Sequence, residues 1–234
     1  AAEAAAAGAA PHRTRLKTGA ARPPRSSSTP IRRATGEAAA AAPPPLCPSL
    51  ILSEREARCA VAVQALREVG REGSLDVVGL SGNLLLRAAL ERCAVGGGVL
   101  KVSLPYPGSA PRASIRPAVD GEPGSLEICG PHGKHYGTLD LREDGTHAVT
   151  QAGNLLMVID GVSAGARLAI STSDGRQMAS AAVSSEYFEG SAYLEIRVQP
   201  GFDMVLIISC VLAVLLLKGE LQLPAVQRWL RAGA

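Results

Sequence analysis

The sequence contains few aromatic residues: Phe, Tyr and Trp together make up 3% of its 234 residues. Proteins that bind single-stranded nucleic acid need aromatic side chains on which bases stack, so this class of function is disfavoured. Charged residues are also scarce, at 19%, whereas apolar residues reach 47%. This composition excludes a fully disordered chain, a collagen-like repeat and a polytopic membrane protein, and it provides enough apolar side chains for one large core.

The cysteines do not form a disulfide pattern. Their number is odd, no Cys-x-x-Cys pair occurs, and Cys210 lies inside an apolar run. Small secreted domains that depend on disulfides have an even number of regularly spaced cysteines. The pattern therefore favours a reducing, intracellular compartment. The five positions are Cys47, Cys59, Cys93, Cys129 and Cys210.

Basic residues gather at the start of the chain. Residues 1–46 hold seven Lys or Arg against two Glu, whereas the remaining residues hold 17 basic and 19 acidic side chains. The first segment consists mainly of Ala, Pro, Ser and Arg, and it lacks the large apolar residues that offset the entropy cost of folding. We predict a disordered basic tail over 1–46. Its composition is typical of organellar transit peptides, and a passive linker is the other interpretation. Because the rest is near neutral, no nucleic-acid partner is expected.

From residue 47 onward, apolar and polar residues alternate in short stretches. In the segment 194–198, Leu194, Ile196 and Val198 alternate with charged residues, which predicts a strand with one face in the core and the other in water. The segment 53–70 permits a helix beginning near Ser53, but the alternation of Cys59, Val61 and Val63 favours a strand. The strands expected from such patterns cover 58–65, 74–79, 83–90, 98–105, 113–118, 125–129, 135–141, 146–151, 154–159, 166–172, 177–183 and 192–198.

Three of these strands share one template. In each, two apolar residues spaced two apart are followed five residues later by a glycine and then by a second apolar stretch. The glycines are Gly82, Gly133 and Gly175, which we expect to adopt the positive φ that tight hairpin turns need. The template therefore predicts one type of hairpin turn that is used repeatedly in an antiparallel sheet.

A single run of residues is apolar on every side. Met204 to Leu217 contains fourteen residues without a charge, with Asp203 before it as an expected N-cap and Lys218-Gly219 after it as an expected helix end. A helix without a polar face must be enclosed by protein or by lipid. At 1.5 Å per residue the run spans about 21 Å, which is shorter than the roughly 30 Å hydrocarbon core of a bilayer. The length favours burial inside protein. The alternative is a tail-anchored membrane protein in which 204–217 spans the bilayer and the β domain is cytosolic.

These patterns predict a mostly antiparallel α+β fold. We expect a closed barrel of about 12 strands around a central hydrophobic C-terminal helix. The expected domain covers 47–218, with the helix at 204–218, and a short amphipathic C-terminal tail follows over 219–234.

The region from about Cys47 to Leu217 resembles the Tubby C-terminal-like superfamily, in particular its phospholipid scramblase and LURP-one-related branch. The resemblance is carried by the strand–turn–strand unit Leu75–Asn83, its echo over 126–137, and the ending Leu194–Val198 followed by Asp203 and the apolar helix. It implies a barrel threaded by its last helix. It also implies a non-enzymatic, membrane-associated domain that binds phospholipids or phosphoinositides.

No cluster of side chains predicts a catalytic or metal site. Cys129, His132 and His135 are residue types that bind zinc, but they straddle an expected turn and lack a fourth ligand. A Cys–His nucleophile pair would need an orienting third group, and none is evident. The acidic residues Asp140, Glu143, Asp144 and Asp160 fit turns better than an acid–base pair. We therefore expect no enzyme activity, no bound metal and no cofactor.

Four basic residues lie near expected loops of the barrel. If some of them converged at one mouth, they would form a site for the phosphate of an anionic phospholipid headgroup, and ordinary solvated side chains are the other interpretation. The function that the resemblance implies makes a membrane surface the expected partner, and the expected location is intracellular, cytoplasmic or membrane-associated. The four candidates are Arg112, Arg116, Lys134 and Arg142.

Overall fold

A computed structural model describes residues 44–69, 73–92, 97–119, 124–161, 167–188 and 191–217. The chain separates into two units, residues 1–38 and 39–234, and all described residues belong to the second. The predictions for most of the basic tail, for Cys93 and for residues 218–234 lie outside the described residues.

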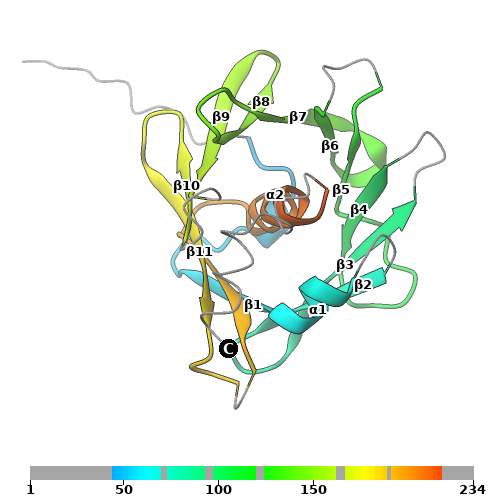
Figure 1. The fold of residues 1–234 in the computed structure, drawn as a ribbon, viewed down its shortest axis with the longest axis vertical. Coiled ribbons are helices and arrows are strands. Elements are labelled where there is room, and N and C mark those ends of the chain that lie inside the picture. The colour runs from blue at the N-terminus through cyan, green and yellow to red at the C-terminus, as the bar shows by residue number, and fades with distance from the viewer. Residues whose placement is uncertain are drawn as a thin grey trace, which may run out of the picture. The chain divides into compact units, whose positions relative to one another are not determined.

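Within the described ranges, twelve strands form one closed barrel in which each strand pairs antiparallel with the next and β12 pairs with β1 (Figure 1). This confirms the predicted fold class. The strands are β1 (Ala57–Ala62), β2 (Gly73–Gly79), β3 (Leu84–Arg92), β4 (Gly98–Ser103), β5 (Ala113–Pro117), β6 (Leu126–Cys129), β7 (His135–Leu141), β8 (His147–Gln151), β9 (Asn154–Asp160), β10 (Leu168–Thr172), β11 (Gln177–Ser184) and β12 (Tyr193–Val198).

The apolar helix α2 (Met204–Leu216) runs through the barrel (Figure 1). Every residue from Val205 to Leu215 is buried, and the helix packs closest to β4, β5 and β12. At roughly 1.5–3 kcal/mol for each large apolar side chain removed from water, these residues form the centre of the hydrophobic core. In this structure the helix is therefore enclosed by protein, and it does not have the position in lipid that the alternative required.

Asp203 begins α2 as predicted. Its carboxylate accepts hydrogen bonds from the backbone N–H groups of Val205 (2.9 Å) and Leu206 (3.1 Å). These groups have no partner within the helix, so the side chain satisfies donors that would otherwise be buried unpaired. At the other end, the side chain of Leu217 lies against Gly98 at the start of β4. Because α2 starts near the end of β12 and finishes near the start of β4, it passes from one mouth of the barrel to the other.

The strand predicted over 58–65 is too long. Strand β1 ends at Ala62, and residues 63–68 form the short helix α1 (Val63–Glu68). Val63 and Leu66 are the buried residues of this helix. Their spacing of three residues places both on one helical face, whereas the alternation that suggested a strand ended with β1. The prediction assigned Cys59, Val61 and Val63 to one strand because they alternate, but only Cys59 and Val61 belong to β1.

The predicted repeat is confirmed as one type of turn. In each copy the first residue donates its N–H to the carbonyl four positions later, and the glycine donates back to the first carbonyl. The glycines have φ angles of +80°, +73° and +82°, a region that side chains with a Cβ rarely adopt. Because the strands alternate in direction, all three turns lie at the end of the barrel where α2 begins. The turns span 79–83, 130–134 and 172–176, with Gly82, Gly133 and Gly175 at the fourth position.

One predicted outward-facing residue is not in water. Glu195 on β12 is only 4% exposed, although the alternation of residues 194–198 placed it on the solvent face. Its carboxylate accepts hydrogen bonds from Arg58 on β1 (2.8 Å from Nε) and from Arg197 (3.0 Å). Arg58 also donates to the hydroxyl of Tyr187. The alternation is correct for the face that Glu195 occupies, but these three neighbours cover the carboxylate.

The stability of the fold should depend on the charge of Glu195. Burial by itself raises the pKa of this carboxyl, but the hydrogen bonds from Arg197 and Arg58 outweigh it, so the pKa is lowered. The stabilisation is therefore complete above the unfolded-state pKa of about 4.3 and is lost as the pH falls through the lower folded-state pKa. We expect Glu195→Gln to reduce the free energy of unfolding by about 1.5 kcal/mol at neutral pH, measured by urea denaturation.

The difference between Glu195→Gln and the wild type should shrink in acid, and an equal difference at about pH 3 and pH 7 would contradict this assignment. Asp76→Asn is the matched control, because Asp76 pairs with Arg87 at 2.9 Å and both side chains are about half exposed. Exposed ion pairs contribute about 0–1 kcal/mol, so this control should change the stability little at either pH.

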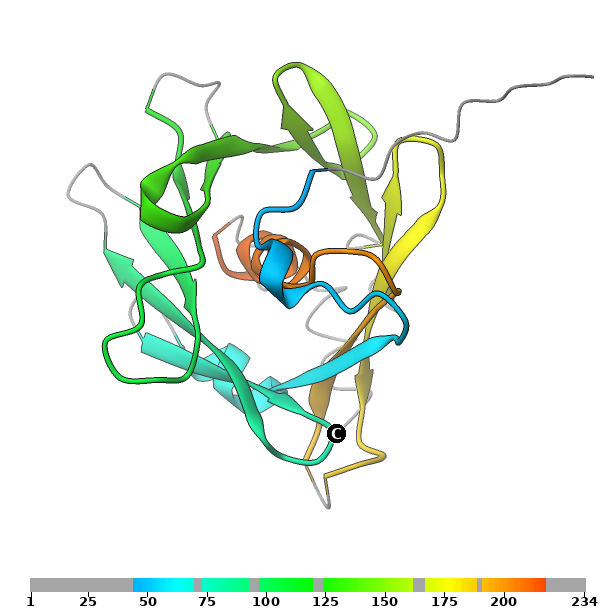
Figure 2. The ribbon, with the colours of Figure 1, turned by 180° about the vertical axis from the view of Figure 1, so that it is seen from behind.

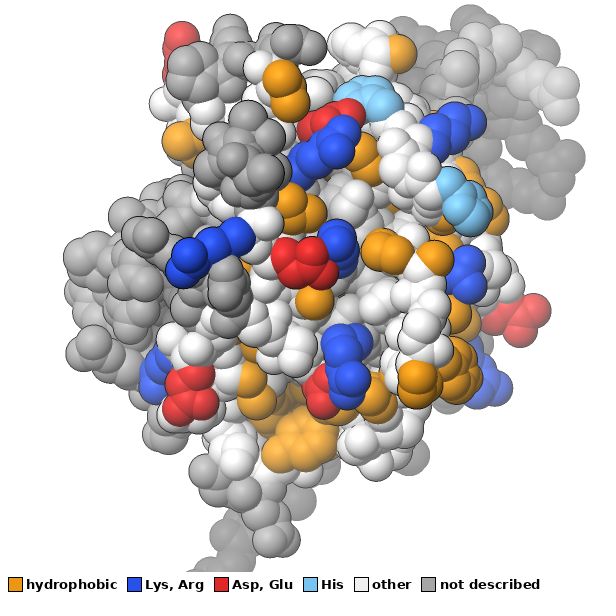
Figure 3. Space-filling model, turned by 90° about the vertical axis from the view of Figure 1, so that its right-hand side faces the viewer, with side chains coloured by type: hydrophobic (Ala, Val, Ile, Leu, Met, Phe, Trp, Pro, Cys, Tyr) orange, Lys and Arg blue, Asp and Glu red, His pale blue; other side chains and the backbone are white. Residues whose placement is uncertain are grey.

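The outer wall of the barrel shows no broad field of one charge on the face seen in Figure 3, where basic and acidic side chains lie next to each other. Three ion pairs between neighbouring strands account for this mixture on the wall formed by β2 to β6. They are Arg87–Asp76, Lys101–Glu91 and Arg116–Glu127. The cations of these three pairs are therefore already compensated by carboxylates on this wall.

Candidate functional site

The segment Pro44–Leu52, here called the strap, crosses the mouth of the barrel at which α2 begins (Figure 2). It contains the 3-10 turn η1 (Pro48–Leu50). The backbone N–H of Cys47 donates to the carboxylate of Asp203 at 2.5 Å, and Leu52 accepts from the N–H of Gly201 at 2.8 Å. The strap therefore binds the same carboxylate that caps α2. Leu46, the residue before Cys47, is also buried. The folded domain therefore begins earlier in the chain than the predicted start at Cys47.

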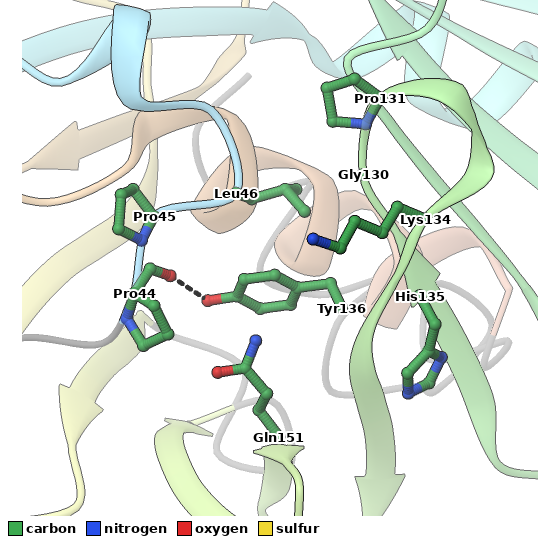
Figure 4. A pocket seen from close by; sticks show the side chains of 9 residues that line it. All are labelled: Pro44, Pro45, Leu46, Gly130, Pro131, Lys134, His135, Tyr136 and Gln151. Carbon is green, nitrogen blue, oxygen red and sulfur yellow. Dashed lines mark hydrogen bonds between the residues drawn. The ribbon is translucent and has the colours of Figure 1, made fainter.

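A pocket of about 390 Å³ lies between the strap and the start of β7 (Figure 4). Three parts of the chain that are distant in sequence form it: the strap, the turn between β6 and β7 that contains η2 (Pro131–Gly133), and the end of β8. The lining residues are Pro44, Pro45, Leu46, Gly130, Pro131, Lys134, His135, Tyr136 and Gln151.

Tyr136 joins the strap to the barrel. Its hydroxyl donates a hydrogen bond of 2.5 Å to the carbonyl oxygen of Pro44 (Figure 4). Burial, followed by the nearby Asp203 and Cys210, raises the pKa of this phenol far above its ordinary value. The hydroxyl therefore stays protonated at physiological pH and remains a donor that fixes one wall of the pocket.

Lys134 supplies the positive charge of the pocket. The turn that contains Gly133 positions it, because the N–H of Gly130 donates to the Lys134 carbonyl at 2.8 Å. The side chain is exposed, and Figure 4 shows its ammonium group directed into the pocket. Among the described residues the ammonium forms no ion pair, and no lining residue is Asp or Glu. The arrangement therefore offers an uncompensated cation to an incoming anion.

Two of the four predicted headgroup candidates, Arg112 and Lys134, lie at the same mouth of the barrel, and the other two do not. Arg112 precedes β5 and donates its backbone N–H to Val102, which places it at the same end as Lys134. Arg116 lies on the outer wall, where its Nε binds Glu127 at 2.9 Å. Arg142 follows β7 and therefore lies at the opposite end. Only Lys134 lines the pocket.

Sequence reasoning missed two residues of the pocket, Tyr136 and Gln151. Tyr136 was recognised only as an apolar position after a turn, and Gln151 only as the end of a strand. A cue exists for the first, since it follows the Gly133 turn directly and a buried tyrosine needs a partner for its hydroxyl. No local cue identifies Gln151, because its position in the pocket depends on the pairing of β7 with β8.

The Cys129–His132–His135 segment forms neither a metal site nor a nucleophile pair. Within the ranges that the structure describes, no group of three His, Cys, Asp or Glu side chains has a geometry that could hold a metal ion. Burial, followed by the charge of Glu127, raises the pKa of the Cys129 thiol, which is the reverse of activation. The Nδ1 atom of His135 lies 3.0 Å from Glu127, whose carboxylate also binds Arg116.

Three of the four acidic residues singled out in the sequence bind groups close to them in the chain or on neighbouring strands. Asp140 accepts hydrogen bonds from Ser125 and from Thr138, the latter at 2.8 Å. Asp144 accepts from the N–H and the hydroxyl of Thr146, and Asp160 accepts from the N–H of Gly161. These carboxylates stabilise turns and strand ends, and they do not face one another as an acid–base pair.

The four cysteines in the described part of the chain, Cys47, Cys59, Cys129 and Cys210, are free and buried. This agrees with the expected lack of a disulfide framework in the described residues. In the same residues, none of the helices is both long enough and apolar enough to cross a lipid bilayer.

Comparisons with known protein families and with curated proteins find no match for this chain. The resemblance to the Tubby C-terminal-like superfamily therefore stays a prediction based on short strand–turn–strand segments and the apolar helix.

Proposed function

We propose that this protein is a non-enzymatic, membrane-associated domain that binds anionic phospholipid headgroups in the pocket beside the strap. The observation that carries the proposal is the Lys134 ammonium, which is directed into a pocket whose described lining residues include no carboxylate. Phosphate oxygens are strong acceptors for such a group. The resemblance to a lipid-binding superfamily and the lack of a catalytic constellation in the described residues agree with this function.

The position of the pocket also suits a membrane surface. It opens at the end of the barrel that carries Arg112, so a second cation lies at the same end as Lys134. Exposed apolar side chains do not distinguish the two ends, because Leu52 and Tyr106 lie at this end and Val119 and Leu141 at the other. The mouth that holds the pocket, with Lys134 and Arg112, is therefore the one that we expect to face the bilayer. A location at a membrane follows from the proposal, whereas organellar targeting by residues 1–46 stays a prediction.

Sedimentation with liposomes tests this proposal. A cation near an anionic membrane contributes about 1 kcal/mol, which corresponds to about a fivefold change in affinity. We expect Lys134→Glu to weaken binding to vesicles that contain anionic phospholipid by at least about fivefold, because the change removes one attraction and adds a repulsion. Arg112→Glu should weaken binding less, because Arg112 lies at the same end without lining the pocket.

Arg142→Glu is the matched control, since it changes the net charge by the same amount at the opposite end of the barrel. Its binding should stay close to that of the wild type. Equal losses for Lys134→Glu and Arg142→Glu would indicate attraction by net charge alone, and undiminished binding of Lys134→Glu would remove the pocket from the proposal.

A further inference from the structure

Among the residues that the structure describes, a single cation lines the pocket, and this favours a ligand of low charge. Lys134 is the only Lys or Arg among the nine described lining residues. One ammonium compensates one negative charge, whereas a second or third charge would enter the pocket without a partner and lose its hydration. Proteins bind groups of several phosphates with clusters of Arg and Lys. The pocket therefore fits a phosphate diester, which carries one charge, better than a headgroup with several phosphates.

Of the other polar residues that line the pocket, His135 has its Nδ1 atom 3.0 Å from Glu127, and Figure 4 shows its ring directed away from Tyr136. The polar groups beside Lys134 are therefore those of Gln151 and Tyr136. Gln151 extends from the end of β8, and Figure 4 shows its amide below the ring of Tyr136. A primary amide offers two donors and one acceptor. The Tyr136 hydroxyl uses its hydrogen on Pro44, so its oxygen stays available as an acceptor. Neutral donors and acceptors in this arrangement match the hydroxyl groups of a small polyol.

The size of the pocket agrees with such a ligand. A volume of about 390 Å³ lies at the lower end of the roughly 300–1,000 Å³ that small-molecule pockets occupy. A phosphate group joined to glycerol is a ligand of matching small size. A headgroup with additional phosphates would need more cations than the described lining residues supply.

We infer that the pocket binds a phosphate diester monoanion esterified to glycerol, with Lys134 on the phosphate and Gln151 on the glycerol hydroxyls. This inference rests on the proposed function and names its ligand class. The same chemistry occurs in the headgroup of phosphatidylglycerol and in the soluble diester glycerophosphoglycerol. Gln151 is then the residue that determines specificity, because it recognises headgroup hydroxyl groups, which a phosphodiester such as phosphatidylethanol lacks.

Phosphatidylethanol tests the role of Gln151, because it has the same phosphodiester charge as phosphatidylglycerol but no headgroup hydroxyl. We expect the full-length protein to prefer phosphatidylglycerol vesicles over phosphatidylethanol vesicles by about tenfold, the effect of one or two hydrogen bonds. Gln151→Leu should remove this preference and keep the binding to phosphatidylethanol. Gln151→Asn, which retains the amide, should keep part of the preference and controls for a change in folding.

Two further experiments distinguish a failure of this inference from a failure of the proposed function. Vesicles that contain phosphatidylinositol bisphosphate at matched surface charge should bind more weakly than phosphatidylglycerol vesicles. A preference for the bisphosphate, or an unchanged preference in Gln151→Leu, would overturn the inference and leave phospholipid binding standing. Binding of glycerophosphoglycerol in calorimetry without binding to any vesicle would support the pocket chemistry and refute the membrane function. Binding of neither would overturn both.

Discussion

Replacement of Leu212 by alanine is expected to lower the free energy of unfolding by about 2–5 kcal/mol, the range observed when a buried leucine is truncated. Leu212 is fully buried in the middle of α2. The barrel surrounds this helix with strands that are paired on both sides, so the wall has little freedom to move inward and fill the cavity. We therefore expect a value in the upper part of this range, measured by urea denaturation.

Leu217→Ala is the matched control, because it removes the same atoms from the end of the helix, where the side chain is only partly buried. The loss of stability should be clearly smaller, since more of the removed surface already faces solvent. Equal losses for Leu212→Ala and Leu217→Ala would contradict an enclosed helix. A helix that lay outside the barrel would give small losses at both positions.

Replacement of Asp203 by alanine is expected to cost about 2–4 kcal/mol. The loss of an N-cap accounts for about 1 kcal/mol, and a buried donor left without an acceptor costs about 1–3 kcal/mol more. Asp203 is 5% exposed and accepts hydrogen bonds from Val205 and Leu206 in the helix and from Cys47 in the strap. Urea denaturation measures the loss.

Asp203→Ser separates the two roles of this carboxylate. A serine caps helices well, but its single oxygen is too short to reach both the helix and the strap, so we expect it to recover about 1 kcal/mol. If Asp203 anchored only the helix, serine would restore nearly the whole stability. Because the strap forms one wall of the pocket, both variants should also weaken binding to anionic vesicles.

These predictions show how the pocket depends on the core. The strap contacts the barrel at Asp203, at Gly201 and at Tyr136, and two of these three contacts lie directly at the start of α2. The position of the central helix therefore sets the position of the strap, and the strap completes the pocket beside Lys134. A change at the helix start should be detected as altered binding even though no residue of α2 lines the pocket.

Much of the fold follows from local sequence patterns. A run of fourteen apolar residues must be enclosed, and a length of about 21 Å is too short for a bilayer. Alternating residues and repeated glycine turns predict antiparallel strands, and the turns at Gly82, Gly133 and Gly175 have the predicted geometry. These features are local, because a side chain's hydrophobicity and a glycine's access to positive φ do not depend on distant residues.

The features that the sequence left unpredicted depend on contacts between distant residues. The burial of Glu195 requires Arg58, which is 137 positions away and becomes its neighbour through the pairing of β1 with β12. The headgroup candidates were chosen for being near loops, but the direction of each strand decides which mouth a loop faces. That direction separates Lys134 from Arg142, although the two residues are only eight positions apart in the chain.

The sequence by itself determined that the chain forms an antiparallel barrel around its last helix, with Asp203 at the start of that helix. Only the tertiary structure decided where a ligand would bind, because closure of the barrel brings Pro44, Tyr136 and Gln151 together around Lys134. The physical reason is the range of the interactions: hydrophobicity and turn geometry act between near neighbours, whereas a pocket is formed by side chains from separate strands.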